Sequence, residues 1–149
     1  MLQAMRKRMG DDKGFTLIEL MVVVLIIAIL IAIAIPTFLG LRQRAQDRAA
    51  QSDLRNALTA AKAFFTDGDT YTGFDAAEGQ AIEPSLTWVD GGAASQNTVH
   101  VKLVSATEVV LATLSASTQA FCIADSSTLG TNRGDEDVAT FAACGPDDW

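Results

Sequence analysis

The sequence predicts an α+β fold, in which a long N-terminal helix packs by its C-terminal half on a small antiparallel β-sheet head. Leu20 to Ile35 is an uninterrupted run of sixteen apolar residues. Over residues 37–65, apolar side chains recur at three- and four-residue steps, the period of an amphipathic helix. From Thr98 onward the period shortens to two, which favours strands.

The apolar segment is long enough to cross a membrane. Phe15 to Ile35 comprises 21 residues, which as a helix span roughly 31 Å, the thickness of a bilayer core. No small-residue cleavage site follows the run, so we expect it to stay in the protein rather than be removed as a secretory signal. Residues 1–14 contain four cations against two acids. This bias places the N-terminus in the cytoplasm and exports the rest of the chain.

Residues 37–65 continue the helix with one apolar stripe. Pro36 removes a backbone donor, so we expect a kink or local loosening there without the end of the helix. Asp67-Gly68-Asp69 is a helix-ending pattern. The predicted stripe consists of Ala50, Leu54, Ala57, Leu58, Ala61, Phe64 and Phe65.

The remainder of the chain predicts a loop to about Pro84 and then a small antiparallel meander. The strand candidates are Leu86–Val89, Thr98–Val104, Val109–Leu114 and Gln119–Ala124. In the second of these, alternation puts Val99, Val101 and Leu103 on one face and His100 and Lys102 on the other. We therefore expect His100, the one histidine in the sequence, to be a solvated side chain and not a general base.

Charge is distributed unevenly along the chain. The net charge is -7, and from Thr66 to the end there are two cations against thirteen acids. An acidic module of this kind is a poor partner for nucleic acid. Arg42, Arg44, Arg48 and Arg55 are expected to form a solvated or subunit-facing helix surface.

Glu19 is a carboxylate at the start of the apolar helix. A charge at the centre of a membrane helix costs about 2.5–3.5 kcal/mol on insertion scales, and less near the interface. A chain that keeps such a charge is expected to use it. The simpler alternative is that Glu19 interacts favourably with the helix dipole in the first turn.

The segment Lys13-Gly14-Phe15-Thr16-Leu17-Ile18-Glu19-Leu20 resembles the processing site of type IV prepilins, and Pro36 also matches that family's pattern. The resemblance implies cleavage between Gly14 and Phe15 by a membrane aspartic peptidase, followed by N-methylation of Phe15. It also implies assembly into a helical homopolymer by an assembly platform and a motor.

The resemblance divides the chain into four parts. They are a leader (1–14), a hydrophobic transmembrane and assembly half of the helix (15–36), an amphipathic half (37–65) and an acidic head (66–149). After cleavage, Glu19 of one subunit can pair with the new Phe15 amine of another. Such a pair would fix the axial offset between neighbouring helices.

Both cysteines, Cys122 and Cys144, lie in the exported part, where oxidation is permitted. We expect a disulfide that ties the C-terminal segment to the last strand; two buried free thiols are the alternative. A C-terminal region bracketed by cysteines also resembles pilins.

Two groups of acidic residues are candidates for a metal site. Asp67, Asp69, Asp75 and Glu78 fall at positions 1, 3, 9 and 12 of a calcium loop. Tyr71 and Thr72 stand where a ligand and the turn glycine belong, so a solvated acidic loop is favoured and no metal or other cofactor is expected. Asp135-Glu136-Asp137 is interpreted as surface.

The sequence thus favours a non-enzymatic type IV pilin precursor, held in the inner membrane first and in a surface filament later, with roles in adhesion, motility or DNA uptake. One alternative is a pseudopilin of a type II secretion or competence system. The other is a binding domain anchored by a single span.

Overall fold

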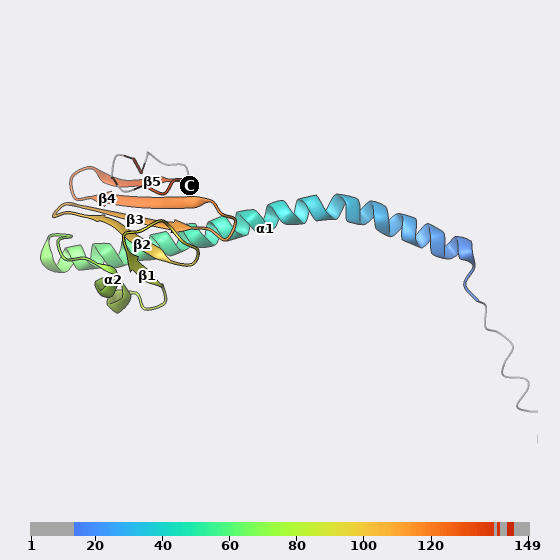
Figure 1. Cartoon of the computed structure of the whole chain (residues 1–149), viewed down its shortest axis with the longest axis horizontal. Coiled ribbons are helices and arrows are strands. Elements are labelled where there is room, and N and C mark those ends of the chain that lie inside the picture. Colours follow the sequence, from blue (N-terminus) through green and yellow to red (C-terminus); the bar gives the residue numbers. More distant parts are fainter. Residues whose placement is uncertain (1–13, 139, 141–142, 145–149) are drawn as a thin grey trace, which may run out of the picture. The chain divides into compact units, whose positions relative to one another are not determined.

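The computed structural model describes residues 14–138, 140, 143 and 144. The chain divides into two units, residues 1–40 and 41–149. Within the described residues two helices and five strands form (Figure 1). They are α1 (Leu17–Gly68), α2 (Ala76–Ile82), β1 (Trp88–Asp90), β2 (Val99–Val104), β3 (Glu108–Leu114), β4 (Ala120–Ser126) and β5 (Gly130–Gly134).

The first unit consists, as far as it is described, of the approach to α1 and its apolar half. The helix continues through Pro36, which confirms that this proline does not end it; the kink stays a prediction. The Thr37 hydroxyl donates to the Ile33 carbonyl at 3.2 Å in the turn around Pro36. By length and composition, α1 contains a stretch able to cross a membrane. Of the predicted leader, residues 1–14, only Gly14 lies within the described residues.

The amphipathic half of α1 packs on the sheet, as predicted. Leu54, Ala57 and Ala61 are completely buried, and Phe64 and Phe65 pack at the edge of the same cluster. Small alanines let the helix backbone approach the sheet closely. The sheet contributes Val99, Val101, Val109, Leu111, Phe121 and Ile123 to this core.

The strands form one sheet in the order β1-β2-β3-β4-β5. All neighbours are antiparallel except β1 and β2, which are parallel with Trp88 opposite Val99. The expectation of a wholly antiparallel meander is therefore wrong at this edge. Gly91 and Gly92 adopt positive φ, and the loop they begin returns the chain to the same end of the sheet. A two-residue hairpin would instead have reversed the direction.

Two elements were missed by the sequence analysis. The predicted loop before Pro84 contains α2, which begins because Asp75 Oδ1 accepts from the Ala77 and Glu78 amides at 2.9 Å each. Gly79 lies against Trp88, and a Cβ there would be 2.6 Å from the indole. The other missed element is β5, which has no apolar residue and so no two-residue period.

A register shift in β2 corrects the predicted faces of this strand. It falls between Val101 and Leu103, and Val104 beyond it packs against the helix-side core. His100 is 5% exposed, so the prediction of a solvated side chain is wrong. Its Nδ1 is 2.7 Å from the Gly91 carbonyl and its Nε2 2.8 Å from Ser95 Oγ. The loop after β1 covers this face and supplies both contacts.

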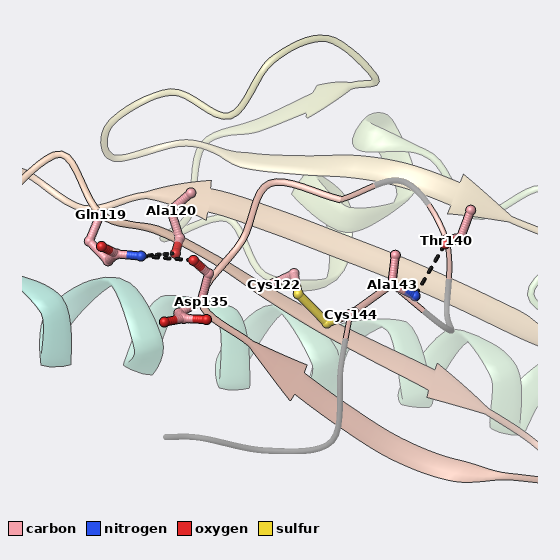
Figure 2. Close-up of a disulfide and its surroundings, with 7 residues drawn as sticks. All are labelled: Gln119, Ala120, Cys122, Asp135, Thr140, Ala143 and Cys144. Atoms are coloured by element: carbon pink, nitrogen blue, oxygen red, sulfur yellow. Dashed lines mark hydrogen bonds between the residues drawn. A yellow bond between two sulfur atoms is a disulfide. The ribbon is translucent and has the colours of Figure 1, made fainter.

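The sheet face opposite α1 carries a second, smaller core. Val110, Ala112, Cys122 and Ala124 point to it, and Cys144 packs among them. Cys122 and Cys144 form a disulfide, as expected (Figure 2). The cysteines therefore attach the C-terminal segment to β4, which is an inner strand because β5 follows it.

Asp137 holds the same C-terminal segment through polar contacts. It accepts from the Ala94 amide at 2.8 Å and pairs with Lys102 Nζ at 2.6 Å. Burial opposes the charge of Asp137, but the Ala94 amide and the Lys102 ammonium outweigh burial and hold the pKa of the carboxyl below its usual value. Lys102 also donates to the Gly92 carbonyl. The segment is thus tied to β2 and to the loop after β1.

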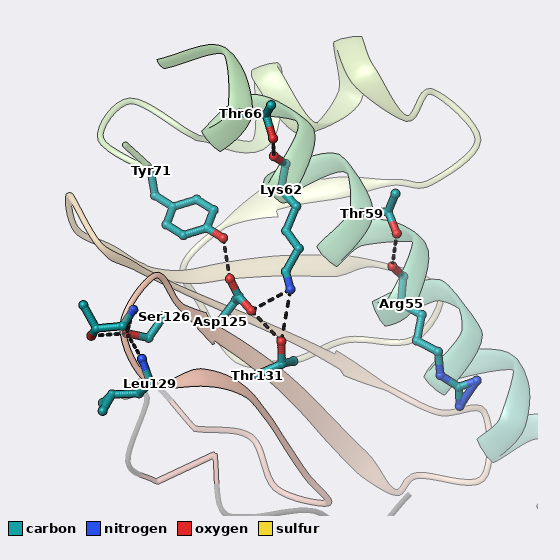
Figure 3. Close-up of polar contacts among 10 residues, drawn as sticks. Arg55, Thr59, Lys62, Thr66, Tyr71, Asp125, Ser126, Leu129 and Thr131 are labelled. Atoms are coloured by element: carbon teal, nitrogen blue, oxygen red, sulfur yellow. Dashed lines mark hydrogen bonds and ion pairs between the residues drawn. The ribbon is translucent and has the colours of Figure 1, made fainter. Parts of the chain in front are cut away.

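A buried polar network joins the end of α1 to the sheet (Figure 3). Asp125 on β4 accepts from the Tyr71 hydroxyl at 2.6 Å and pairs with Lys62 at 2.9 Å. Thr131 on β5 contacts both Asp125 and Lys62. Burial, and then the hydrogen bond to the negative Asp125, raise the pKa of the Tyr71 phenol. Tyr71 therefore stays a donor at physiological pH.

Removing the disulfide is expected to destabilise the head. Closure of the loop between positions 122 and 144, 22 residues apart, corresponds to about 3 kcal/mol on the chain-entropy model. Cys122→Ala/Cys144→Ala should lower the free energy of unfolding, measured by chemical denaturation, by about 3 kcal/mol, and dithiothreitol should lower it in the wild type alone. Unchanged protease resistance after reduction would contradict a stabilising disulfide.

Tyr71→Phe is expected to cost about 1.5–3 kcal/mol of head stability, because the charged acceptor Asp125 loses the hydrogen bond that the Tyr71 hydroxyl donates. Chemical denaturation measures the effect. Thr59→Ala is the matched control, because Thr59 is exposed and donates only to the Arg55 carbonyl on its own helix. Equal stability of the Tyr71 variant and the control would show that the network contributes nothing.

Candidate functional site

The Gly14–Phe15 junction lies just before α1 and is open. Gly14, Phe15 and Thr16 precede the first helical residue, Leu17. A Cβ built on Gly14 meets no atom within 4 Å, and Phe15 is 84% exposed. Nothing in the described fold therefore requires glycine at position 14. A requirement for glycine there has to come from a molecule that approaches this peptide bond.

Thr16 and Glu19 form a capping box at the start of α1. Glu19 Oε2 accepts from the Thr16 amide at 2.9 Å and from the Thr16 hydroxyl at 2.7 Å, while the Glu19 amide donates back to Thr16 Oγ1 at 3.3 Å. These bonds satisfy amides that the first helical turn leaves unpaired. Sequence analysis missed Thr16, although the Thr-x-x-Glu spacing at a helix start is a known signal for this motif.

The capping box bears on both interpretations of Glu19. It agrees with the simpler interpretation, in which Glu19 is an acid placed favourably in the first turn of the helix. Within the described residues its hydrogen bonds fall on Oε2 alone, so Oε1 has room for a further donor. The register role stays a prediction, and the geometry of the single chain is compatible with it.

The surface that follows Glu19 is apolar on every side. Every leucine, isoleucine, valine, methionine and phenylalanine from Leu20 to Leu41 is exposed. An amphipathic helix would have one polar side, and a continuous apolar patch of this size needs lipid or another protein surface to cover it. The site is therefore a helix start with a single carboxylate, next to a surface that requires a partner.

The acidic candidates for calcium are not supported. Asp75 caps α2, and Asp67 and Asp69 lie at the end of α1. Among the described residues no three His, Cys, Asp or Glu side chains gather in a way that could hold a metal ion. Asp135 and Glu136 are exposed, whereas Asp137 belongs to the contacts of the C-terminal segment.

Comparison with known proteins identifies the N-terminal motif. Residues 9–35 match the family model described as the prokaryotic N-terminal methylation motif. The chain is 49% identical over 63 residues to the type IV major pilin protein PilA of Myxococcus xanthus, covering 42% of this chain and 29% of that one. It is 44% identical over 69 residues to the type IV wide pilus major component PilA4 of Thermus thermophilus, covering 46% and 53%.

A further match is the type II secretion system core protein G of Vibrio cholerae, 44% identical over 55 residues, covering 35% of this chain and 38% of that one. No solved structure matches. The matched region spans between 29% and 53% of the lengths of these three relatives. The chain therefore carries the prepilin methylation motif, and its homologues include type IV major pilins.

Proposed function

We propose that the chain is the precursor of a structural subunit of a type IV pilus, without enzymatic activity. The observation that carries the proposal is the methylation motif at residues 9–35 on an exposed helix start, followed by an apolar surface that the chain leaves uncovered. The homologous major pilins support the same function. A long helix and an oxidised, sheet-containing head agree with it.

Processing is proposed between Gly14 and Phe15. The bond is exposed and lies outside the helix, so a membrane peptidase reaches it without unfolding α1. The missing side chain of Gly14 lets the enzyme approach the backbone closely. Cleavage removes the basic leader and creates a positive amine on Phe15, which is then methylated.

Assembly is proposed to use that amine and Glu19. In an apolar filament core an unpaired carboxylate is strongly unfavourable, whereas a paired one fixes the relative position of its partners. Oε2 stays in the capping box with Thr16, and Oε1 accepts from the Phe15 amine of a neighbouring subunit. The pair sets the axial offset, and the apolar residues around it supply the contact area.

The apolar surface is proposed to have two successive environments. Both the precursor and the cleaved subunit that awaits assembly cross the inner membrane with the head exported. An assembly platform and its motor then move it into the filament, where other subunits replace the lipid. Pro36, which leaves one carbonyl of the helix without its usual donor, gives the helix a place to adjust during this transfer.

A pseudopilin is the second candidate, supported by the match to the type II secretion protein. Pseudopilins resemble pilins but build a short filament confined to the envelope. Electron microscopy of cells separates the two functions. Long surface fibres that disappear when the gene is deleted indicate a pilin, and secretion defects without such fibres indicate a pseudopilin.

Gly14→Val is expected to block cleavage, because the side chain fills the space where the peptidase meets the backbone. Immunoblots of whole cells should show the chain migrating at the precursor size. Gly40→Ala is the control, since a Cβ at either glycine meets no atom of the chain within 4 Å. Normal processing of Gly14→Val would exclude this bond as the cleavage site.

Glu19→Val is expected to be cleaved normally and to lower the yield of sheared surface filaments at least about tenfold, because a buried pair is lost. Glu78→Val serves as the control, because Glu78 lies in the first turn of α2 just as Glu19 does in α1. Filament yield equal to that of the wild type would refute the register role of Glu19.

A further inference from the structure

A cavity of about 180 Å³ lies in the second unit, between the middle of α1 and the end of β3. The helix contributes Gln46, Ala50 and Asp53, and Thr113 and Ser115 close the opposite side. Asn97, from the loop before β2, completes it. The lining is small or polar apart from Leu114, so the cavity suits a polar group better than an apolar one.

Among the described residues, Asp53 is the one ionisable side chain that lines this cavity, and it has no counter-ion there. The carboxylate is half-buried, and burial raises its pKa above the usual value. Across the described residues it makes neither a hydrogen bond nor an ion pair. Its neighbours at helical spacing, Ala49, Ala50, Asn56 and Ala57, are uncharged. No group among the described residues compensates the charge, and the alanines leave the approach open.

The same unit carries three cations that are also without partners. Arg42, Arg44 and Arg48 are exposed on α1, and within the described residues none of them forms an ion pair. They cannot reach Asp53 along the helix, because only side chains three or four residues apart meet and Arg48 is five residues away. None of these three guanidinium groups is therefore expected to enter the cavity of its own chain.

We propose that the cavity at Asp53 receives an arginine of the segment 42–48 from a second copy of this chain. This inference rests on the proposed function, since it requires assembly. Charge complementarity selects the partner: beyond Thr66 the chain has only Lys102 and Arg133 as cations, and Lys102 is already paired with Asp137. The exposed cations of α1 are the donors a second copy offers.

Sequence separations make Arg48 the expected donor. Arg48 precedes Asp53 by five residues, whereas Arg44 and Arg42 lie nine and eleven residues before it. A shift of about 7–8 Å between parallel helices of two copies therefore brings Arg48 of one copy level with Asp53 of the other. In the cavity, guanidinium donors can bind the carboxylate bidentately and use the hydroxyls of Thr113 and Ser115 as further acceptors.

Reciprocal charge reversal tests the pair in cells that process and assemble the chain. Asp53→Arg and Arg48→Asp should each lower the yield of surface filaments at least about tenfold, as expected for one partner of a desolvated pair. The double variant should recover most of the wild-type yield. If the donor is another arginine of the segment, filament yield should instead recover when Asp53→Arg is combined with Arg42→Asp or with Arg44→Asp.

Controls separate assembly from folding and processing. Asp135→Arg makes the same charge change on an exposed side chain and should leave the yield unchanged. Protease resistance and mature size show that each variant folds and is cleaved. Asp53→Asn, nearly isosteric, extends the test if Asp53→Arg does not fold, and should also reduce the yield.

The outcomes are distinct. If the wild type forms filaments, two results would overturn the cavity contact: full filament yield from both Asp53 variants, or no recovery of yield in any of the three double variants. Either result would leave the proposed function standing. Absence of filaments from the wild type, with the leader retained, would remove the proposed function itself.

Discussion

The uncovered apolar surface of α1 is the constraint on which the other features depend. Every large side chain from Leu20 to Leu41 is exposed in the single chain, so this half of the helix is stable only in lipid or against other proteins. Glu19 is the carboxylate at its N-terminal edge, and the hydrogen bonds of the capping box with Thr16 already satisfy one of its oxygens. A surface so apolar has little orientational preference of its own, and the proposed pair at Glu19 would supply one.

The head is built around one helix. Leu54 and its alanine neighbours cover one face of the sheet, and no helix of the described residues covers the opposite face. The C-terminal segment takes that place, held by the Cys122–Cys144 disulfide and by Asp137 with Lys102. A disulfide commonly holds a segment in place where the apolar core is too small to do so by burial alone.

The sequence predicted what periodicity and composition encode, and missed what depends on single contacts. The long helix and its buried stripe were predicted because they follow from the spacing of apolar residues, and the disulfide because the head is expected to be exported. The loop after β1, which makes that strand parallel, and the burial of His100 follow from tertiary packing. The strand β5 was not predicted because Gly130–Gly134 contains no apolar residue and so shows no two-residue period. The role of Thr16 follows from the position of Glu19 three residues after a hydroxyl, and not from the charge of Glu19.

The central claim is that the apolar helix becomes an assembly surface only after the leader is removed. Mass spectrometry of the subunit in purified surface filaments tests it most directly. A pilin subunit lacks residues 1–14 and begins with N-methylated Phe15, with one disulfide in its head. A membrane-associated chain that keeps Met1 to Gly14 and is absent from surface filaments would contradict the account and identify a single-span anchor instead.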